Sequence, residues 1–301
     1  MSILVLGTVA LDSVKTPFGE RQEILGGSAA HFSMAARIFT KVYLVSIIGL
    51  DFPPKFIKFL ADKGVILSGI KKEQGNTFRW QGKYEGDCNT AITIDTQLGV
   101  LSIFKPQISK EHRVIKNIFL ANVDPDIQSC LLDSMKNPKF IGLDSMNYWI
   151  NTKKESLLKV IKRVHLFVAN EQEARSLTGE NNLVKAAAGL TKLGAKMVVI
   201  KKGEHGVIFY SPKVIFSLPA FPVTEVIDPT GAGDTFAGGL MGYLATKDKI
   251  RNSDIKQALA YATICASFNV EGFGLEKTAK LTRNYLEKRL KEYRMISSLT
   301  D

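Results

Sequence analysis

The sequence predicts an α/β fold in which helices cover both faces of a mostly parallel central sheet, a three-layer αβα arrangement. Three short apolar runs, at residues 3–6, 42–48 and 118–121, are typical of strands that are buried on both faces. Beyond residue 116, such runs alternate with segments of helical periodicity, which indicates repeated strand–helix–strand units. In sheets of this kind the ligand site lies outside the carboxyl ends of the strands.

The individual elements follow from the same patterns. A helix begins after Gly26 and Gly27 and extends to about residue 39, and residues 53–63 have the apolar spacing of an amphipathic helix. Beyond residue 116, strands are expected at 118–121, 140–143, 166–168 and 197–200. Helices are expected at 126–136, 152–163, 171–178 and 183–193. A β-like stretch at 224–227 precedes a last predicted helix that ends near residue 245.

Between about residues 68 and 104 the pattern changes. Short β-rich runs are separated by Gly, Asn and Asp, with no helical segment between them. Together with residues 13–24, this region is expected to form a small antiparallel sheet inserted into the core, where it could cover a site as a lid. Apart from this insert, residues 1–301 are expected to form one domain.

The composition is that of a globular protein, with 45% hydrophobic and 23% charged residues. No apolar run reaches the roughly 18 residues of a membrane span, and the first residues favour a buried strand over a signal peptide. Cys88, Cys130 and Cys265 lie far apart, without His at ligand spacing, which favours free thiols in the cytoplasm. The net charge of +11 leaves nucleic-acid binding open, but the basic residues are dispersed and no nucleic-acid motif accompanies them.

The segment 227–239, IDPTGAGDTFAGG, carries the clearest chemical signal. Gly231 and Gly233 allow a tight turn at a helix start, so backbone N–H groups, including that of Ala232, can converge on an anion. Asp234 then lies beside the anion, where a carboxylate is unfavourable unless it acts as a base. Phosphoryl transfer to a hydroxyl needs such a base. The alternative is a glycine-rich helix start capped by Asp234, without catalysis.

This segment resembles the C-terminal signature of the ribokinase-like (PfkB) carbohydrate kinase family, and the resemblance extends over nearly the whole chain. Residues 7–12 resemble its G-x-x-x-x-D element, whose aspartate, here Asp12, binds substrate hydroxyls. Gly26 and Gly27 match a di-glycine that serves as lid hinge and substrate contact. Residues 48–52 resemble a further G-x-D-x-x-G element, although its last glycine is absent here. The resemblance implies an ATP-dependent kinase fold over residues 1–301.

The resemblance also implies a nucleotide and metal site. The N-x-x-E element of the family organises magnesium and phosphate, and its glutamate here is Glu173. Asn170 and Glu173 can equally form a simple capping box at a helix start, and the two roles are compatible. The implied cofactors are ATP and Mg²⁺, and the implied nucleotide-binding residues are Asn170, Lys202, Gly203, Gly206, Thr230 and Phe273.

The substrate side departs from the family pattern. His31 stands where G-G-x-x-x-N enzymes have an asparagine that contacts the sugar. It can bind the substrate or be a buried helix residue, and both readings remain open. Arg79, Trp80 and Tyr84 in the inserted segment suit stacking on a base or pairing with a substrate phosphate. They equally suit the interface of a homodimer formed through the lid.

The acceptor is expected to be a small-molecule sugar or nucleoside. A sugar phosphate is less favoured, because no cluster of basic residues marks a second phosphate site. A non-catalytic ligand-binding or regulatory protein on the same fold is the alternative from another class. The presence of Asp234, Gly231, Gly233 and Glu173 argues against it. Nucleic-acid binding, suggested by net charge alone, is a third reading, and neither nucleic acid nor membrane is expected as a partner.

Overall fold

The computed structural model describes residues 1–86 and 88–298. In this part of the chain the main sheet has nine strands in the order β13-β12-β11-β10-β9-β8-β1-β4-β5. Neighbouring strands from β5 to β11 are parallel, and β12 and β13 add an antiparallel edge. The strands are β1 (Ser2–Leu6), β4 (Lys41–Gly49), β5 (Ile66–Glu73), β8 (Asn117–Leu120), β9 (Phe140–Asp144), β10 (Leu166–Asn170), β11 (Met197–Lys201), β12 (Val207–Ser211) and β13 (Val214–Leu218).

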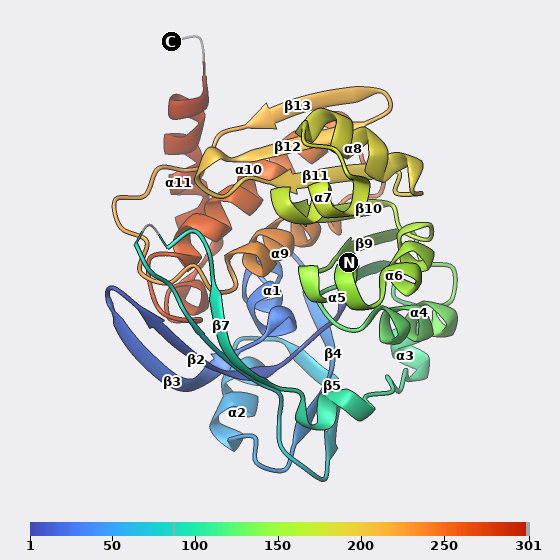
Figure 1. The fold of residues 1–301 in the computed structure, drawn as a ribbon, viewed down its shortest axis with the longest axis vertical. Helices are drawn as coiled ribbons and strands as arrows, with labels where there is room; N and C mark the ends of the chain where they lie inside the picture. Colours follow the sequence, from blue (N-terminus) through green and yellow to red (C-terminus); the bar gives the residue numbers. More distant parts are fainter. Residues whose placement is uncertain (87, 299–301) are drawn as a thin grey trace.

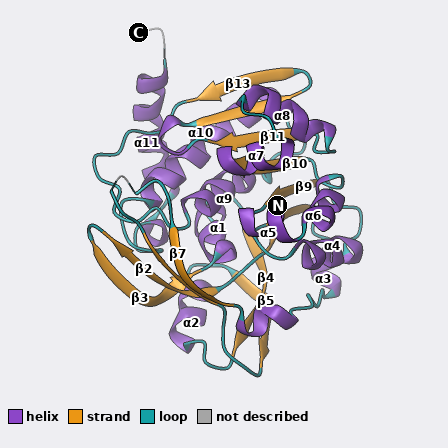
Figure 2. Ribbon diagram, viewed as in Figure 1, coloured by secondary structure: helices purple, strands orange, loops and turns teal. Residues whose placement is uncertain are grey.

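Helices cover both faces of this sheet, as Figure 2 shows. Alternate residues of the strands enter two separate cores: Ile3 and Val5 pack on one face, and Leu4 and Leu6 on the other. The first core includes residues of α1 (Ser28–Ala36), α2 (Pro54–Asp62), α9 (Ala232–Leu244) and α10 (Asn252–Asn269). The second includes residues of α4 (Pro125–Ser134), α5 (Asn147–Thr152), α6 (Lys154–Ile161), α7 (Glu171–Thr178) and α8 (Leu183–Lys192). The predicted three-layer fold is therefore confirmed.

A second, four-stranded sheet lies beside the first, at the lower left of Figure 1. Its order is β3-β2-β6-β7, from β2 (Ala10–Thr16), β3 (Gly19–Gly26), β6 (Arg79–Lys83) and β7 (Ile92–Gln97). Strands β2 and β6 are parallel, and the other two pairs are antiparallel. The small inserted sheet is therefore present, with one parallel pair in place of a purely antiparallel arrangement.

The boundaries expected for the insert, 13–24 and 68–104, are corrected at two places. Residues 68–73 belong to β5 of the main sheet, which pairs with β4, and Leu67 and Ile70 pack on the first core. Residues 100–104, expected as one of the short β-rich runs, lie largely in a 3₁₀ helix (Gly99–Ile103), with Val100 and Leu101 buried in the second core. In both cases contact with the main core decides the structure, which local β propensity cannot show.

One further strand is absent where it was expected. Residues 224–227 are irregular, because the N–H groups of Ile227 and Asp228 donate to the carbonyl of Val270, at the end of α10, instead of to a neighbouring strand. The loop before α9 is thus held by a helix end.

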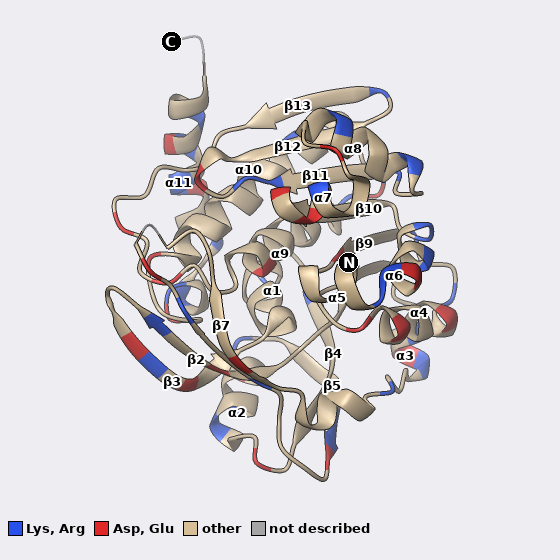
Figure 3. Cartoon of the chain, viewed as in Figure 1, with Lys and Arg blue, Asp and Glu red and all other residues tan. Residues whose placement is uncertain are grey.

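Charged side chains are distributed over many elements. Figure 3 shows Lys and Arg interspersed with Asp and Glu in this view, on helices and on both sheets. Among the described residues, no helix combines the length and the hydropathy needed to cross a bilayer.

Candidate active site

The loop before α9 is fixed by a buried carboxylate. Asp228 is fully buried and accepts hydrogen bonds from the N–H of Thr230 at 2.9 Å and of Gly274 at 3.0 Å. The Thr230 carbonyl accepts from Nδ2 of Asn269 at 2.8 Å. The loop therefore has a defined shape before any ligand binds.

Two glycines in this loop are required by their surroundings. Gly231 is the N-cap of α9 with φ of 73°, in the left-handed region. A Cβ added at Gly231 would overlap the imidazole of His31. A Cβ at Gly233 would lie 3.0 Å from Nζ of Lys201. Between them, the N–H of Ala232 donates to the Pro229 carbonyl at 3.1 Å, which closes a turn at the helix start.

Asp234 lies in the first turn of α9. Burial, and after it the nearby Asp144, raise the pKa of its carboxyl to about 7, while Lys201 opposes the shift. A carboxyl with a pKa close to neutral can hold or release a proton at physiological pH, as a general base must.

Two strand ends lie beside Asp234. Asp144 ends β9, Lys201 ends β11, and the Nζ of Lys201 lies 2.9 Å from Oδ2 of Asp144. Neither residue was among the site residues predicted from the sequence. Each is a polar residue directly after a buried parallel strand, and this signal could have identified both.

Glu173 belongs to the same cluster. Its Oε2 accepts from the N–H of Asn170 at 2.8 Å, and its own N–H donates to Oδ1 of Asn170 at 2.8 Å, so the expected capping box is present. Burial raises the pKa of Glu173 to about 7, and Asp144 adds to the shift while Lys201 opposes it. In the described part of the chain, no three Asp, Glu, His or Cys side chains converge as a preformed metal site.

Asp12 and the di-glycine form the opposite side of the site. Oδ2 of Asp12 accepts from the N–H of Gly27 at 3.2 Å. A Cβ on Gly26 would overlap this carboxylate, and one on Gly27, where φ is 93°, would lie 2.6 Å from the Thr8 carbonyl oxygen. The pKa of Asp12 is raised to about 7, mainly by burial and also by Asp228 and Asp234, while the hydrogen bond from the N–H of Gly27 opposes the shift.

His31 lies behind the loop. It is 1% exposed, and its Nδ1 lies 3.1 Å from Oδ1 of Asn269, which also accepts from the Thr235 hydroxyl. Burial lowers the pKa of His31, which favours the neutral imidazole. The structure therefore places His31 against the backbone of Gly231, in a buried network that supports the loop.

Arg79 is held by acidic neighbours. Its guanidinium pairs with Asp51 at 2.7 Å and with Glu23 at 2.9 Å. In this arrangement two carboxylates already balance its single positive charge. Arg79 joins β6 of the small sheet to the G-x-D element of residues 49–51.

Apart from Asn170 and Thr230, described above, the predicted nucleotide residues lie in two places. Nζ of Lys202 donates to the His205 carbonyl at 3.2 Å, across a turn in which Gly203 and Gly206 have positive φ. Phe273 is 4% exposed and lies under the β2–β3 hairpin, where the guanidinium of Arg21 is 4.4 Å from the centre of its ring. The Phe273 ring is thus engaged by the small sheet.

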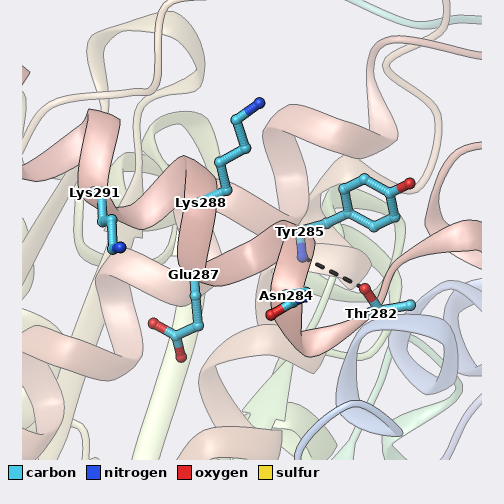
Figure 4. Close-up of a pocket in the computed structure, with 6 residues that line it drawn as sticks. All are labelled: Thr282, Asn284, Tyr285, Glu287, Lys288 and Lys291. Carbon is cyan, nitrogen blue, oxygen red and sulfur yellow. Dashed lines mark hydrogen bonds between the residues drawn. The ribbon is translucent and has the colours of Figure 1, made fainter.

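A surface hollow lies elsewhere, on the C-terminal helix α11 (Arg283–Ser297). Figure 4 shows its side chains, with the N–H of Tyr285 donating to the Thr282 hydroxyl at 3.4 Å. It contains none of the predicted site residues; those that line it are Thr282, Asn284, Tyr285, Glu287, Lys288 and Lys291.

The sequence and the fold match known proteins. Residues 8–280 match the model of the pfkB family carbohydrate kinases. A cytidine kinase of Thermococcus kodakarensis is 32% identical over 251 residues, which cover 81% of this chain and 88% of that protein. A nucleoside kinase of Methanothermobacter thermautotrophicus is 39% identical over 270 residues, which cover 88% of this chain and 84% of that protein.

Solved structures share the fold. One of them, named Ribokinase II from E. coli and in complex with ATP and Mg²⁺, superposes with a TM-score of 0.76 over 97% of this chain and 99% of that one, at 21% identity. Family match, sequence identity and fold agree with one another. The chain therefore belongs to the pfkB family of carbohydrate kinases, as a sugar or nucleoside kinase with the ribokinase-like fold.

Proposed function

We propose that this protein is a nucleoside kinase that transfers the γ-phosphoryl group of ATP to a ribose hydroxyl. The observation that carries this proposal is the position of Asp234 in the first turn of α9, in the site whose other side is formed by Asp12 and the di-glycine. The preference for a nucleoside over a free sugar comes from the two relatives, a cytidine kinase and a nucleoside kinase, that match most of the chain.

Asp12 and Asp234 have different roles in this proposal. Asp12, buried against the di-glycine turn, accepts hydrogen bonds from acceptor hydroxyls that do not react. Asp234 orients the reacting hydroxyl and takes its proton. The N–H groups of the Gly231–Gly233 segment donate to the phosphoryl oxygens, and the positive end of the α9 dipole favours the charge that develops there.

The residues present fit ATP and Mg²⁺. The loop carries no side chain at Gly231 or Gly233, so its backbone can approach phosphates closely. Magnesium, when bound with the nucleotide, neutralises phosphate charge and keeps much of its water shell. Glu173 suits a contact through such a water, because its carboxyl is buried near Asp144 and Asp234. The Lys202–Gly206 turn borders the nucleotide in this proposal.

The small sheet acts as a cover for the acceptor. Its members Val14 and Tyr84 pack with Val226, which precedes the anion-hole loop. Covering the site keeps water from competing with the acceptor for the phosphoryl group. The same sheet is also our proposed dimer contact, since Ile92 and Ile94 of β7 are 42% and 54% exposed. A doubled mass in light scattering tests the dimer.

A panel assay tests the proposed function. The purified protein is given ATP and Mg²⁺ with cytidine, other nucleosides, ribose, fructose and sugar phosphates, and ADP release is measured. Turnover of a nucleoside at least tenfold more efficient than that of any free sugar supports the proposal. Preference for a sugar or a sugar phosphate would assign another acceptor. No turnover of any compound would favour the non-catalytic alternative.

A further inference from the structure

Lys201 is a largely buried cation at the carboxyl end of β11. Its side chain is 19% exposed and its Nζ lies 2.9 Å from Oδ2 of Asp144, which is 5% exposed. The pair joins the ends of β9 and β11, which are separated in the sheet by β10. The aliphatic part of the lysine is thus fixed by the strand, and its ammonium group by one carboxylate.

The ammonium group faces the anion-hole loop. A Cβ built on Gly233 would lie 3.0 Å from Nζ of Lys201, and 3.8 Å from its Cε. The end of the Lys201 side chain therefore lies directly over the peptide that precedes Asp234. An anion bound by the N–H groups of this loop would come within reach of the lysine.

The local charge balance also points to a ligand. Lys201 is a cation beside three carboxylates, those of Asp144, Glu173 and Asp234, each of which raises its pKa. Burial alone would lower the pKa of Lys201, but these carboxylates outweigh it and raise the pKa, so the ammonium stays protonated. A buried ion pair by itself adds little to stability compared with an apolar pair. Stabilisation of the fold alone therefore does not explain the Lys201–Asp144 pair.

We propose that Lys201 is a catalytic residue that donates a hydrogen bond to a non-bridging oxygen of the phosphoryl group in transfer, while Asp144 positions it. This inference rests on the proposed kinase function. Asp234 takes the proton of the acceptor hydroxyl as the acceptor oxygen forms its bond to the γ-phosphorus. The bond from that phosphorus to the β–γ bridging oxygen breaks, and its electron pair leaves with ADP. Lys201 keeps its proton throughout and offsets charge on the moving group.

Two variants separate this role from a structural one. Lys201→Met removes the charge and keeps much of the chain length, whereas Lys201→Arg keeps the charge. Lys196→Met is the matched control, because Lys196 is exposed and directly precedes the opposite end of the same strand. Affinities for ADP and for a non-hydrolysable ATP analogue are measured by calorimetry, beside the single-turnover rate.

We expect Lys201→Met to weaken binding of the ATP analogue about tenfold, with ADP affinity nearly unchanged, because ADP lacks the group that Lys201 contacts. The single-turnover rate should fall by about 10²–10³. Lys201→Arg should recover most of the analogue binding, and Lys196→Met should match the wild type in every measurement.

A second comparison covers loss of folding. If Lys201→Met unfolds because Asp144 is left unpaired, Asp144→Asn and the double variant Asp144→Asn/Lys201→Met are compared instead, since their difference isolates the lysine. The inference would be overturned if removing the lysine left the ratio of ATP-analogue affinity to ADP affinity unchanged and the single-turnover rate within threefold of the reference protein. Lys201 would then be only a counter-ion of Asp144. The affinity ratio needs no acceptor. A failed acceptor panel would therefore reject the nucleoside kinase without deciding the role of Lys201.

Discussion

The hydroxyl of Tyr84, in the small sheet, lies 3.2 Å from the hydroxyl of Thr230, in the loop that leads to Asp234. Tyr84 is 9% exposed, and its N–H donates to the carbonyl of Lys15 on β2 at 2.8 Å. A second contact joins the same segment to the predicted nucleotide turn, from Nδ2 of Asn89 to Oε1 of Glu204 at 3.3 Å. The small sheet therefore touches both halves of the candidate site.

Because of the Tyr84–Thr230 contact, we expect the small sheet and the loop before α9 to be energetically coupled. Tyr84→Phe removes one hydroxyl but keeps the ring packed against Val14, so the loss should be about 0.5–1.5 kcal/mol, or up to about tenfold in kcat/KM. Thr230→Val should have a similar effect, and the double variant should be no worse than either single one. Additive losses in this double-mutant cycle would mean that the two hydroxyls act separately. Tyr285→Phe, at an exposed position on α11, is the control.

Because the carboxyl of Asp12 is buried, we expect stability to depend on pH in an unusual way. Its pKa is 3.8 in the unfolded chain and about 7 in the folded one, mainly because of burial. Between these values the unfolded state binds fewer protons, so the free energy of unfolding falls as pH rises. Asp12→Asn removes this cost, and at pH 8 it should be more stable than the wild type by on the order of 4 kcal/mol.

The advantage of Asp12→Asn should vanish below pH 3.8, where the carboxyl is protonated in both states. Denaturant unfolding at pH 4, 6 and 8 measures it. For Asp254 the expected pH dependence of stability has the opposite sign. Hydrogen bonds from the N–H and guanidinium of Arg251 hold the pKa of Asp254 below the usual range. Asp254→Asn should therefore destabilise at pH 7 and converge with the wild type in acid. A pH-independent effect of Asp12→Asn would refute the burial argument.

Much of the site could be predicted because its signals are local in the sequence. The Gly231–Asp234 turn, the Asn170–Glu173 capping box and the di-glycine beside Asp12 each depend on residues a few positions apart or on one strand pair. The pairing of Lys201 with Asp144 could not be predicted in this way. It requires the order of the strands, because 57 positions separate the two residues.

The same reason explains the errors in the fold. Strand β5 and the small sheet have similar local composition, and contact with β4 decides that β5 joins the main sheet.

Arg79 could be placed in the lid from the sequence, but its partners Asp51 and Glu23 come from distant segments. His31 likewise lies far in sequence from Asn269, its partner in the structure.

We expect substitution of Glu173 to change the dependence of activity on magnesium. Glu173→Gln keeps an oxygen that can accept from the N–H of Asn170, so the capping box and the fold should persist. The loss of negative charge should raise the magnesium concentration for half-maximal activity several-fold. Glu171→Gln is the control, because that carboxylate lies in the same helical turn and pairs with Arg175 at 3.1 Å. An unchanged magnesium dependence in Glu173→Gln would remove its proposed role.

Asp234→Asn tests the central claim most directly, in a single-turnover assay with ATP, Mg²⁺ and the acceptor found by the panel. The variant keeps the size of the side chain and the helix start, so the Gly231–Gly233 segment should still bind phosphate. Loss of the base should slow transfer by about 10²–10⁴, or about 3–5 kcal/mol. Nucleotide affinity, measured in parallel, should hold or improve because a nearby negative charge is removed. Transfer within a few-fold of the wild-type rate would contradict the assignment of Asp234 as the base.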